Sequence, residues 1–129
     1  MDDSQVKKVK SFEDLTAWKA AREVRKYAYL IANKLPVSEK TNLVSQIKRA
    51  AVSITANIAE GYGRYHYQEN IQYCRQSRGS LYEVKDHFIT CLDENYITSE
   101  EYAKGEALMD TAARLLNGYI SYLNRSKLT

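Results

Sequence analysis

Apolar residues recur every three or four positions along most of this chain, which is the spacing of one face of an α-helix. The residues between them offer few places to turn, because the 129-residue sequence holds one proline and five glycines. No segment alternates apolar and polar residues over a useful length, so we expect no β-sheet. The pattern favours a few long helices.

Residues that start or stop helices divide the chain into four helical segments. Ser and Thr side chains can bond the free N–H groups at a helix start, whereas proline and glycine end helices. The expected starts are at Ser11, Ser38, Tyr67 and Thr98. The expected ends are at Pro36, Gly61-Tyr62-Gly63, Asn95 and just after Leu123. Four amphipathic helices with short connections predict an all-α, antiparallel up-down four-helix bundle over residues 11–125, preceded by a flexible basic tail at residues 1–10.

The second helical segment has a polar stripe beside its apolar one. Five polar residues recur at spacings of 3, 4, 4 and 3: Gln46, Arg49, Ser53, Asn57 and Glu60. We expect Arg49, Asn57, Glu60 and Glu83, with Gln46 beside them, to form a polar cluster that bonds two helices together and fixes their register. Removal of one partner from such a buried cluster would cost about 3–5 kcal/mol. The alternative is that these residues bind a ligand or RNA.

Short motifs distributed along the chain carry a family resemblance. They are Phe12-Glu13-Asp14-Leu15 with Trp18, Leu35-Pro36, Gln46-x-x-Arg49-Ala50-Ala51, Asn57-Ile58-Ala59-Glu60-Gly61 and Gly79-Ser80-Leu81-Tyr82-Glu83. Together they resemble the four-helix-bundle family encoded in intervening sequences of bacterial 23S rRNA genes. The resemblance implies a bundle that assembles into homo-oligomers, with a pentamer expected, and an association with RNA. A distant relative, the accessory variability protein of diversity-generating retroelements, binds nucleic acid and a reverse transcriptase.

Charge is unevenly spread along the chain. Residues 1–65 hold 12 Lys and Arg against 7 Asp and Glu, and residues 66–129 hold 7 against 9, so the halves carry +5 and −2. The basic half could face nucleic acid, the acidic half of the same fold, or a neighbouring subunit. The candidate RNA-binding residues are Lys19, Arg22, Arg25, Lys26, Lys48, Arg64, Arg75 and Arg78.

Tyrosine is abundant, with 11 residues in the chain. Tyr65, Tyr67 and Tyr73 could stack on unpaired bases, and tyrosine is also common at protein interfaces. The alternative to RNA contact is therefore a solvated helix face with a tyrosine-lined subunit interface.

Signatures of catalysis and of bound cofactors or metals are missing from the sequence. It has no His-Glu-x-x-His motif, phosphate-binding glycine loop or nucleophile elbow. His66 and His87 are far apart, and neither follows a glutamate by three residues as a di-iron bundle requires. Cys74 and Cys91 fit no zinc spacing, so we expect free buried thiols. We expect no cofactor, no metal and no small-molecule substrate.

No apolar run approaches the roughly 18 residues that span a bilayer, and the acidic, polar start lacks a signal peptide's apolar core. We therefore expect a cytoplasmic protein without membrane contact. The first functional hypothesis is a non-catalytic homo-oligomer that contacts structured RNA or a ribonucleoprotein. The second is a protein-interaction adaptor without nucleic-acid binding, and the third is an enzyme that uses Arg49, Asn57 and Glu60.

Overall fold

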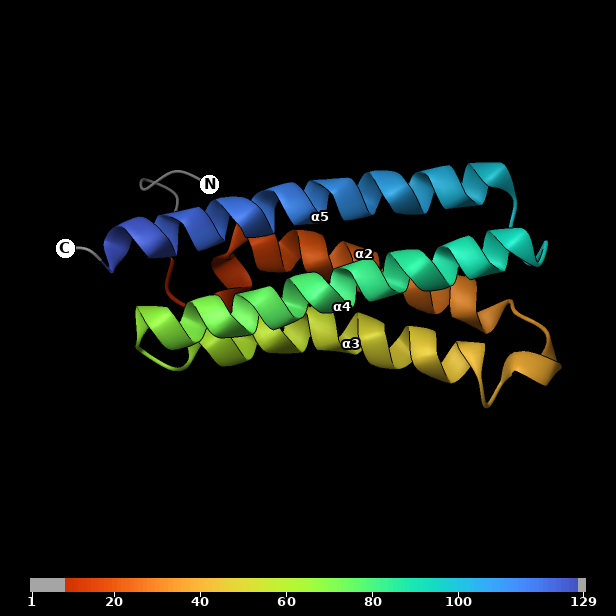
Figure 1. Ribbon diagram of the computed structural model, residues 1–129, viewed down its shortest axis with the longest axis horizontal. Coiled ribbons are helices and arrows are strands. Elements are labelled where there is room, and N and C mark those ends of the chain that lie inside the picture. The colour runs from red at the N-terminus through yellow and green to blue at the C-terminus, as the bar shows by residue number, and fades with distance from the viewer. Residues whose placement is uncertain (1–8, 128–129) are drawn as a thin grey trace.

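The computed structural model describes residues 9–127, in which four long helices run alternately up and down (Figure 1). The helices are α2 (Thr16–Asn33), α3 (Leu43–Tyr62), α4 (Tyr67–Asp93) and α5 (Ser99–Ser126). Two short 3₁₀ turns, η1 (Phe12–Asp14) and η2 (Val37–Glu39), precede α2 and α3. There is no β-strand within residues 9–127, which confirms the predicted all-α bundle. The predicted basic tail lies outside the described residues except for Val9 and Lys10.

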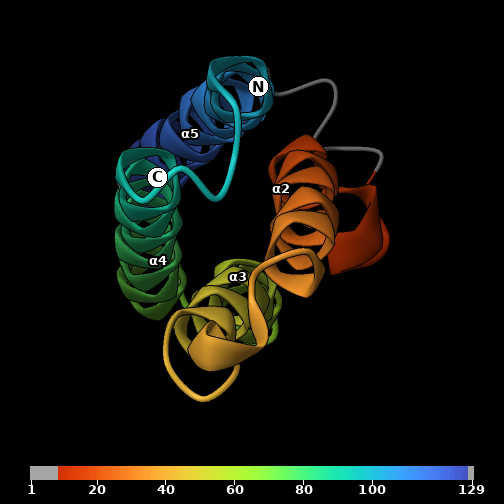
Figure 2. The same cartoon turned by 90° about the vertical axis from the view of Figure 1, so that its right-hand side faces the viewer.

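The four helices form a square in which chain neighbours are also neighbours in space. Viewed along the bundle, α2 lies beside α3 and α5, and α4 lies beside the same two helices (Figure 2). The helices α2 and α3 therefore form one side of the bundle, and α4 and α5 form the other. Because the chain simply goes up and down, these two sides correspond to its N-terminal and C-terminal halves.

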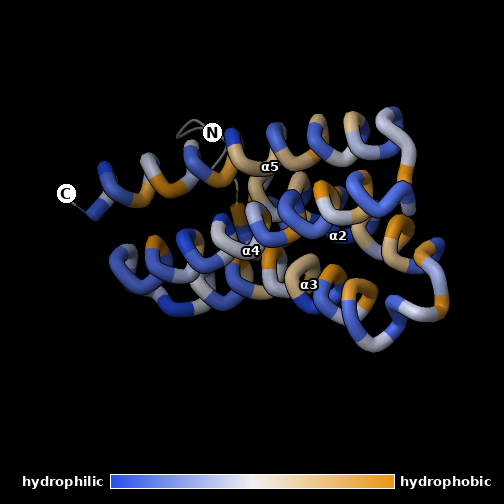
Figure 3. The backbone as a smooth tube through the Cα atoms, turned by 45° about the vertical axis from the view of Figure 1, so that its right-hand side comes forward, coloured by the Kyte–Doolittle hydropathy of each residue, from blue (hydrophilic) through white to orange (hydrophobic). Residues whose placement is uncertain are grey.

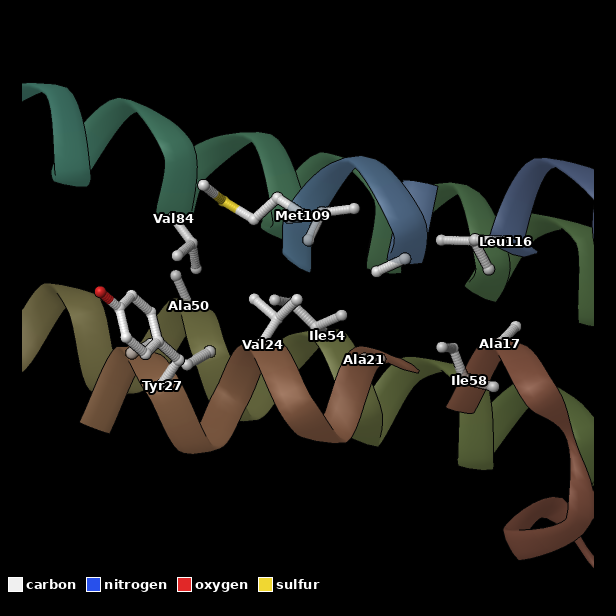
Figure 4. Close-up of a cluster of buried hydrophobic side chains, with 14 of the residues drawn as sticks. Ala17, Ala21, Val24, Tyr27, Ala50, Ile54, Ile58, Val84, Met109 and Leu116 are labelled. Atoms are coloured by element: carbon white, nitrogen blue, oxygen red, sulfur yellow. The ribbon is translucent and has the colours of Figure 1, made fainter. Parts of the chain in front are cut away.

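One apolar stripe from each helix fills the centre of the bundle. Hydrophobic and hydrophilic residues alternate along each helix at helical spacing (Figure 3). Val24 of α2, Ile54 of α3, Val84 of α4 and Met109 of α5 point toward one another, and all four are at most 3% exposed (Figure 4). Complete burial of an aliphatic side chain of this size contributes about 1.5–3 kcal/mol to folding. The core is therefore the main source of stability.

Two glycines permit close packing between helices. A Cβ at Gly61 in α3 would lie 2.7 Å from Asn70 Oδ1 and 2.9 Å from Tyr73 Cβ of α4. A Cβ at Gly105 in α5 would lie 2.8 Å from Cε2 of Phe88, whose ring is fully buried. Real Cβ contacts are not this short, so each glycine makes room for the neighbouring helix.

Some of the observed helix boundaries agree with those predicted from the sequence, and others do not. Thr98 Oγ1 accepts a hydrogen bond from Glu101 N at 3.0 Å and Glu101 Oε1 accepts one from Thr98 N at 2.8 Å, a reciprocal capping box that confirms the predicted helix start at Thr98. Ser11 also caps a helical turn with Asp14, but that turn is the separate 3₁₀ turn η1. The predicted start at Ser38 is wrong. Ser38 lies inside η2 and does not cap α3, which begins only at Leu43.

The predicted end at Gly61-Tyr62-Gly63 is confirmed, because α3 ends at Tyr62 with Gly63 as its C-cap. The backbone conformation of these glycines, however, is not the one that a glycine cap usually takes. Gly61 is still helical and Gly63 has a φ of −75°, so neither takes the left-handed conformation expected of a glycine cap. The residue that takes it is Tyr65, with a φ of 64°. At position 61 the close approach of α4 leaves no room for a Cβ, a packing constraint that the local sequence does not reveal.

Candidate nucleic-acid interface

The two sides of the bundle differ in charge. The helices α2 and α3 hold six Lys and Arg against two Glu, a net charge of +4. The helices α4 and α5 hold six Lys and Arg against eight Asp and Glu, a net charge of −2. We call the outward surface of α2 and α3 the basic side, whose cations are Lys19, Arg22, Arg25, Lys26, Lys48 and Arg49.

Acidic side chains neutralise few of these cations. Lys26 Nζ lies 3.6 Å from Glu23 Oε2 on the same exposed helix face, a pair worth little in water. Within the described part of the chain, the other five cations of the basic side form no ion pair. Elsewhere in the basic half, Lys34 and Arg64 do pair with Glu101 and Glu69 of the acidic half. Pairing inside the fold, one of the alternatives left open by the sequence, therefore neutralises little of the charge of the basic side itself.

A groove between α2 and α3 runs through the basic side. It has a volume of about 580 Å³ and includes Arg25, Lys26, Tyr29, Leu30 and Val52 in its lining. The groove thus combines positive charge with aromatic and aliphatic surface, which is the composition that binds a nucleic-acid strand by its phosphates and its bases.

Specific contacts hold Arg25 in this groove and Lys48 beside the Tyr29 ring that lines it. Arg25 Nη1 donates to Thr55 Oγ1 of α3 at 2.9 Å, which fixes the guanidinium between the two helices. Lys48 Nζ lies 5.2 Å from the centroid of the Tyr29 ring, within the range of a cation–π contact. Both cations remain partly exposed, so an anion can reach them.

A second aromatic contact lies toward the start of α2. The guanidinium carbon of Arg22 lies 5.8 Å from the centroid of the Trp18 ring, and Phe12 meets the same ring edge-on at 5.2 Å. Phe12 is positioned by η1, where backbone N–H groups of Lys10 and Ser11 hold the pKa of Asp14 below its usual value. Together with exposed Lys19, this arrangement continues the basic side along α2.

Arg64, another predicted RNA-binding residue, lies apart from the basic side in the α3–α4 turn. Its Nε is 3.3 Å from Glu60 Oε2, and its Nη1 is 3.8 Å from Glu69 Oε2. Its Nη2 donates to the Tyr73 hydroxyl at 2.7 Å. Its neighbours Tyr73 and Glu60 raise the pKa of Arg64, and two glutamates already balance its charge. Arg64 is thus a poor phosphate ligand in this arrangement.

The two remaining candidates lie on α4, on the other side of the bundle. Arg75 Nη1 contacts Gln72 Oε1 at 3.4 Å, and Arg78 Nη1 donates to Asn117 Oδ1 of α5 at 2.8 Å. The structure therefore divides the predicted RNA-binding residues among three places, of which the basic side gathers most of them.

The predicted polar cluster of Gln46, Arg49, Asn57, Glu60 and Glu83 is not formed. Arg49 is exposed, Glu60 pairs with Arg64 of the turn that follows α3, and Glu83 pairs with His87 within α4. Gln46 Nε2 donates to Asn42 Oδ1 at 2.9 Å, again locally. The stripe lies partly outside the α3–α4 contact, so most of its members turn to solvent.

Small residues make the polar contact between these helices instead. Asn57 Nδ2 donates to Ser53 Oγ at 2.9 Å, and Ser80 Oγ of α4 donates to the same oxygen at 2.8 Å. Ser77 Oγ of α4 donates to the carbonyl oxygen of Ile54 at 2.6 Å, in the buried interior. The stripe predicted that α3 has a second contact face, but the partners on α4 are serines rather than Glu83.

A tyrosine-lined pocket was missed by reasoning from the sequence. It lies where the α3–α4 turn meets the C-terminal part of α5, and it includes Tyr62, His66, Asn70, Tyr119 and Tyr122. The abundance of tyrosine was the available signal, but only the bundle brings residues 62–70 together with residues 119–123.

We searched the part of the chain that the structure describes for clusters of metal ligands and for membrane-spanning helices. Within residues 9–127, no group of three or more His, Cys, Asp or Glu side chains is placed to hold a metal ion. Over the same range, no helix is long and apolar enough to cross a bilayer. Cys74 and Cys91 are free and buried, as predicted.

A family model described as 23S rRNA-intervening sequence protein matches residues 13–118. The chain belongs to this family. No match was found among curated proteins. In this member of the 23S rRNA-intervening sequence protein family, two of the motifs that carried the resemblance have a structural explanation. The Phe12–Leu15 motif builds η1 and its contact with Trp18, and Gly61 makes room for α4.

Proposed function

We propose that the protein is a non-catalytic homo-oligomer that contacts structured RNA or a ribonucleoprotein through its basic side. One observation carries the proposal: cations without acidic partners lie beside the exposed surfaces of Trp18 and Tyr29 along one side of the bundle. The family name, which refers to 23S rRNA, makes that RNA the first one to test.

The physical basis of the proposed contact is charge neutralisation. Each Lys or Arg that neutralises a phosphate releases condensed counterions, so affinity depends steeply on salt. A single chain offers few such contacts. Assembly would repeat the basic side around a symmetric oligomer, and several weak sites on one RNA would then act at a high effective concentration.

Exposed apolar residues support the assembly part of the proposal. Leu30 is 58% exposed, Val52 is 43% exposed and Ile89 is 39% exposed. Leu30 and Val52 line the same groove, and adjoining exposed apolar side chains are typical of surfaces that contact another protein. The pentamer that the family resemblance implies stays a prediction, as does a cytoplasmic location.

A protein-interaction adaptor is the second candidate, and the same exposed residues favour it. Leu30 and Val52 lie in the groove of the basic side, so a protein partner could cover them there. In that case the cations would serve solubility, and affinity for RNA would be weak at all salt concentrations. The third hypothesis is an enzyme that uses Arg49, Asn57 and Glu60, and the geometry does not favour it, because Glu60 pairs with Arg64 and Asn57 bonds Ser53.

Binding of the purified, nuclease-treated protein to 23S rRNA fragments, unrelated RNA and duplex DNA at two salt concentrations tests the proposal. The mass of the assembly is measured in the same buffers. We expect tight RNA binding by an intact oligomer and a steep loss of affinity at the higher salt. An intact oligomer that binds no RNA at low salt would exclude the RNA contact and favour the adaptor. A monomer would contradict the assembly.

A further inference from the structure

The tyrosine-lined pocket lies at one end of the bundle, where α2 begins, α3 ends, α4 begins and α5 ends (left in Figure 1). Its volume is about 260 Å³. Leu15, Tyr119 and Leu123 are at most 3% exposed and form a closed floor, whereas Tyr65 and Tyr67 are exposed at the rim. The pocket thus has the form of a site for a small planar group that enters from solvent.

Aromatic rings line this pocket on more than one face. Tyr119 and Tyr122 stack with their ring centroids 6.5 Å apart and their planes 9° from parallel. Tyr62, at the end of α3, lines the pocket as well. Flat rings around a space of this size favour a flat aromatic ligand, because stacking on tyrosine tolerates any π-face.

A polar pair lies in the lining of the pocket. Asn70 is 8% exposed, and its Nδ2 donates to the Tyr119 hydroxyl at 3.0 Å. Within residues 9–127, that hydroxyl donates to no acceptor of the protein. Burial raises the pKa of Tyr119 to about 12, so the hydroxyl keeps its proton at neutral pH. It can therefore donate to a ligand oxygen or ring nitrogen.

The rim of the pocket holds a tyrosine in an unfavourable backbone conformation. Tyr65 has a φ of 64°, a region that bulky residues rarely adopt, and its side chain is 95% exposed. Glycine would fit that conformation without strain and would expose no ring. A strained residue that gains nothing from burial points to a role outside folding.

An adjacent groove continues from the same rim. It has a volume of about 450 Å³, shares Tyr62 and Tyr65 with the pocket, and is also lined by Lys10. A strand whose base enters the pocket could therefore place a neighbouring phosphate near the Lys10 ammonium group. The pocket and the groove together match a nucleotide within a chain.

We propose that the tyrosine-lined pocket binds one unpaired nucleobase of an RNA, stacked on Tyr65 and Tyr122 and hydrogen-bonded to the Tyr119 hydroxyl. This inference rests on the proposed function and adds the kind of RNA that the protein would prefer. The basic side holds the paired regions of an RNA by their phosphates without regard to sequence, and the pocket selects RNAs that carry an unpaired nucleotide.

Two RNA hairpins with stems of equal length, each closed by a non-nucleotide linker so that no loop base is unpaired, test the inference: one stem is fully paired and the other carries a single-nucleotide bulge. The variants are Tyr65→Gly and Tyr122→Leu, with Tyr82→Leu, exposed on α4, as the matched control. We expect the native protein to bind the bulged hairpin at least about five-fold more tightly than the paired one, the lower end of the stacking range per base. Both pocket variants should lose this preference, and Tyr82→Leu should keep it.

The stability of Tyr65→Gly separates a binding role from a structural one. We expect its urea midpoint to be equal to or above that of the native protein, since the strain at position 65 is relieved. A lower midpoint together with lost preference would overturn the assignment of Tyr65 to binding.

The remaining outcomes distinguish this inference from the proposed function. Equal binding of both hairpins by the native protein would overturn the inference and leave RNA contact through the basic side intact. No binding of either hairpin at low salt would overturn both. AMP or UMP that binds with the same sensitivity to Tyr122→Leu, without discrimination between hairpins, would assign the pocket to free nucleotides instead.

Discussion

Glycines within the helices of this bundle differ in their surroundings: some are packed against a neighbouring helix, and one is exposed. Gly61 and Gly105 each lie against a neighbouring helix at a distance too short for a Cβ. Gly79, on the exposed face of α4, has no heavy atom within 4 Å of the position of a Cβ. All three lie within helices, where alanine is intrinsically favoured by about 1 kcal/mol. Only packing distinguishes them.

Alanine substitutions at these glycines should therefore change stability in opposite directions. Overpacking of a filled interior costs about 1–3 kcal/mol, so Gly61→Ala and Gly105→Ala should lower the free energy of unfolding despite the better helix propensity. Gly79→Ala should raise it by up to about 1 kcal/mol. Urea denaturation of the three variants measures these changes. A stabilised Gly105→Ala would mean that the Phe88 ring moves aside easily.

Buried ionisable groups should make the fold sensitive to alkali. Burial raises the pKa of Cys74 from 9.0 to about 12 and that of Cys91 from 9.0 to about 11. Above pH 9 the unfolded chain releases these protons and the folded chain keeps them, so the free energy of unfolding falls as pH rises. Each fully ionised thiol contributes about 1.4 kcal/mol per pH unit.

Urea midpoints between pH 7 and pH 10.5 measure this dependence. The double variant Cys74→Ala, Cys91→Ala should show a shallower decline above pH 9, with the buried Tyr119 phenol still contributing above pH 10. Its lower stability at pH 7, caused by the smaller side chains, does not affect the comparison of slopes. Equal slopes would show that the thiols are accessible to solvent in the folded protein.

At the scale of the helices, two hydroxyl side chains that look alike in the sequence differ in the structure. Thr98 begins α5 with a reciprocal capping box, and Glu101 of the same box also pairs with Lys34 of the connection after α2. Hydrogen bonds from Lys34 and from the Thr98 backbone lower the pKa of Glu101. Ser38 lies within η2 and caps no helix.

Thr98→Ala should therefore destabilise the fold by about 1 kcal/mol, the usual cost of a lost helix cap. Ser38→Ala, the matched control, should change the free energy of unfolding by less than about 0.5 kcal/mol. Urea denaturation at neutral pH compares them. A loss of similar size in Ser38→Ala would restore the capping role that the sequence suggested for it.

Sequence periodicity predicted the helices well because each helix buries one continuous stripe. The start of α4 at Tyr67 and the box at Thr98 were predictable from local signals. The polar stripe of α3 was predictable as a pattern but not in its contacts, because a rotation of a few tens of degrees decides whether Arg49 meets α4 or water. The tyrosine-lined pocket needed the three-dimensional fold, since Asn70 and Tyr119 come from different helices.

At the scale of the whole molecule, the up-and-down path of the chain converts a charge difference along the sequence into a charge difference between two sides. The N-terminal half becomes the basic side, and the α4–α5 side carries −2. A polyanion approaching the bundle is thus attracted by one side and weakly repelled by the other. The loss of RNA affinity on removal of a cation should then depend on the side of the bundle on which that cation lies.

Two pairs of substitutions test this orientation. Arg22→Gln with Lys26→Gln removes two cations from the basic side, and Arg75→Gln with Arg78→Gln removes two from α4. For the first pair, we expect the slope of log affinity for RNA against log salt concentration to become shallower by roughly 1.4 to 1.8 for each chain that contacts RNA, because each phosphate contact contributes about 0.7 to 0.9. For the second pair, we expect little change in this slope.

Filter binding or fluorescence anisotropy across a salt series measures both slopes, and the mass of the assembly confirms that both variants keep the native oligomer. Equal effects of the two pairs would mean that RNA surrounds the bundle without a preferred side, and a larger effect of the α4 pair would place the RNA contact on the opposite side from the one proposed.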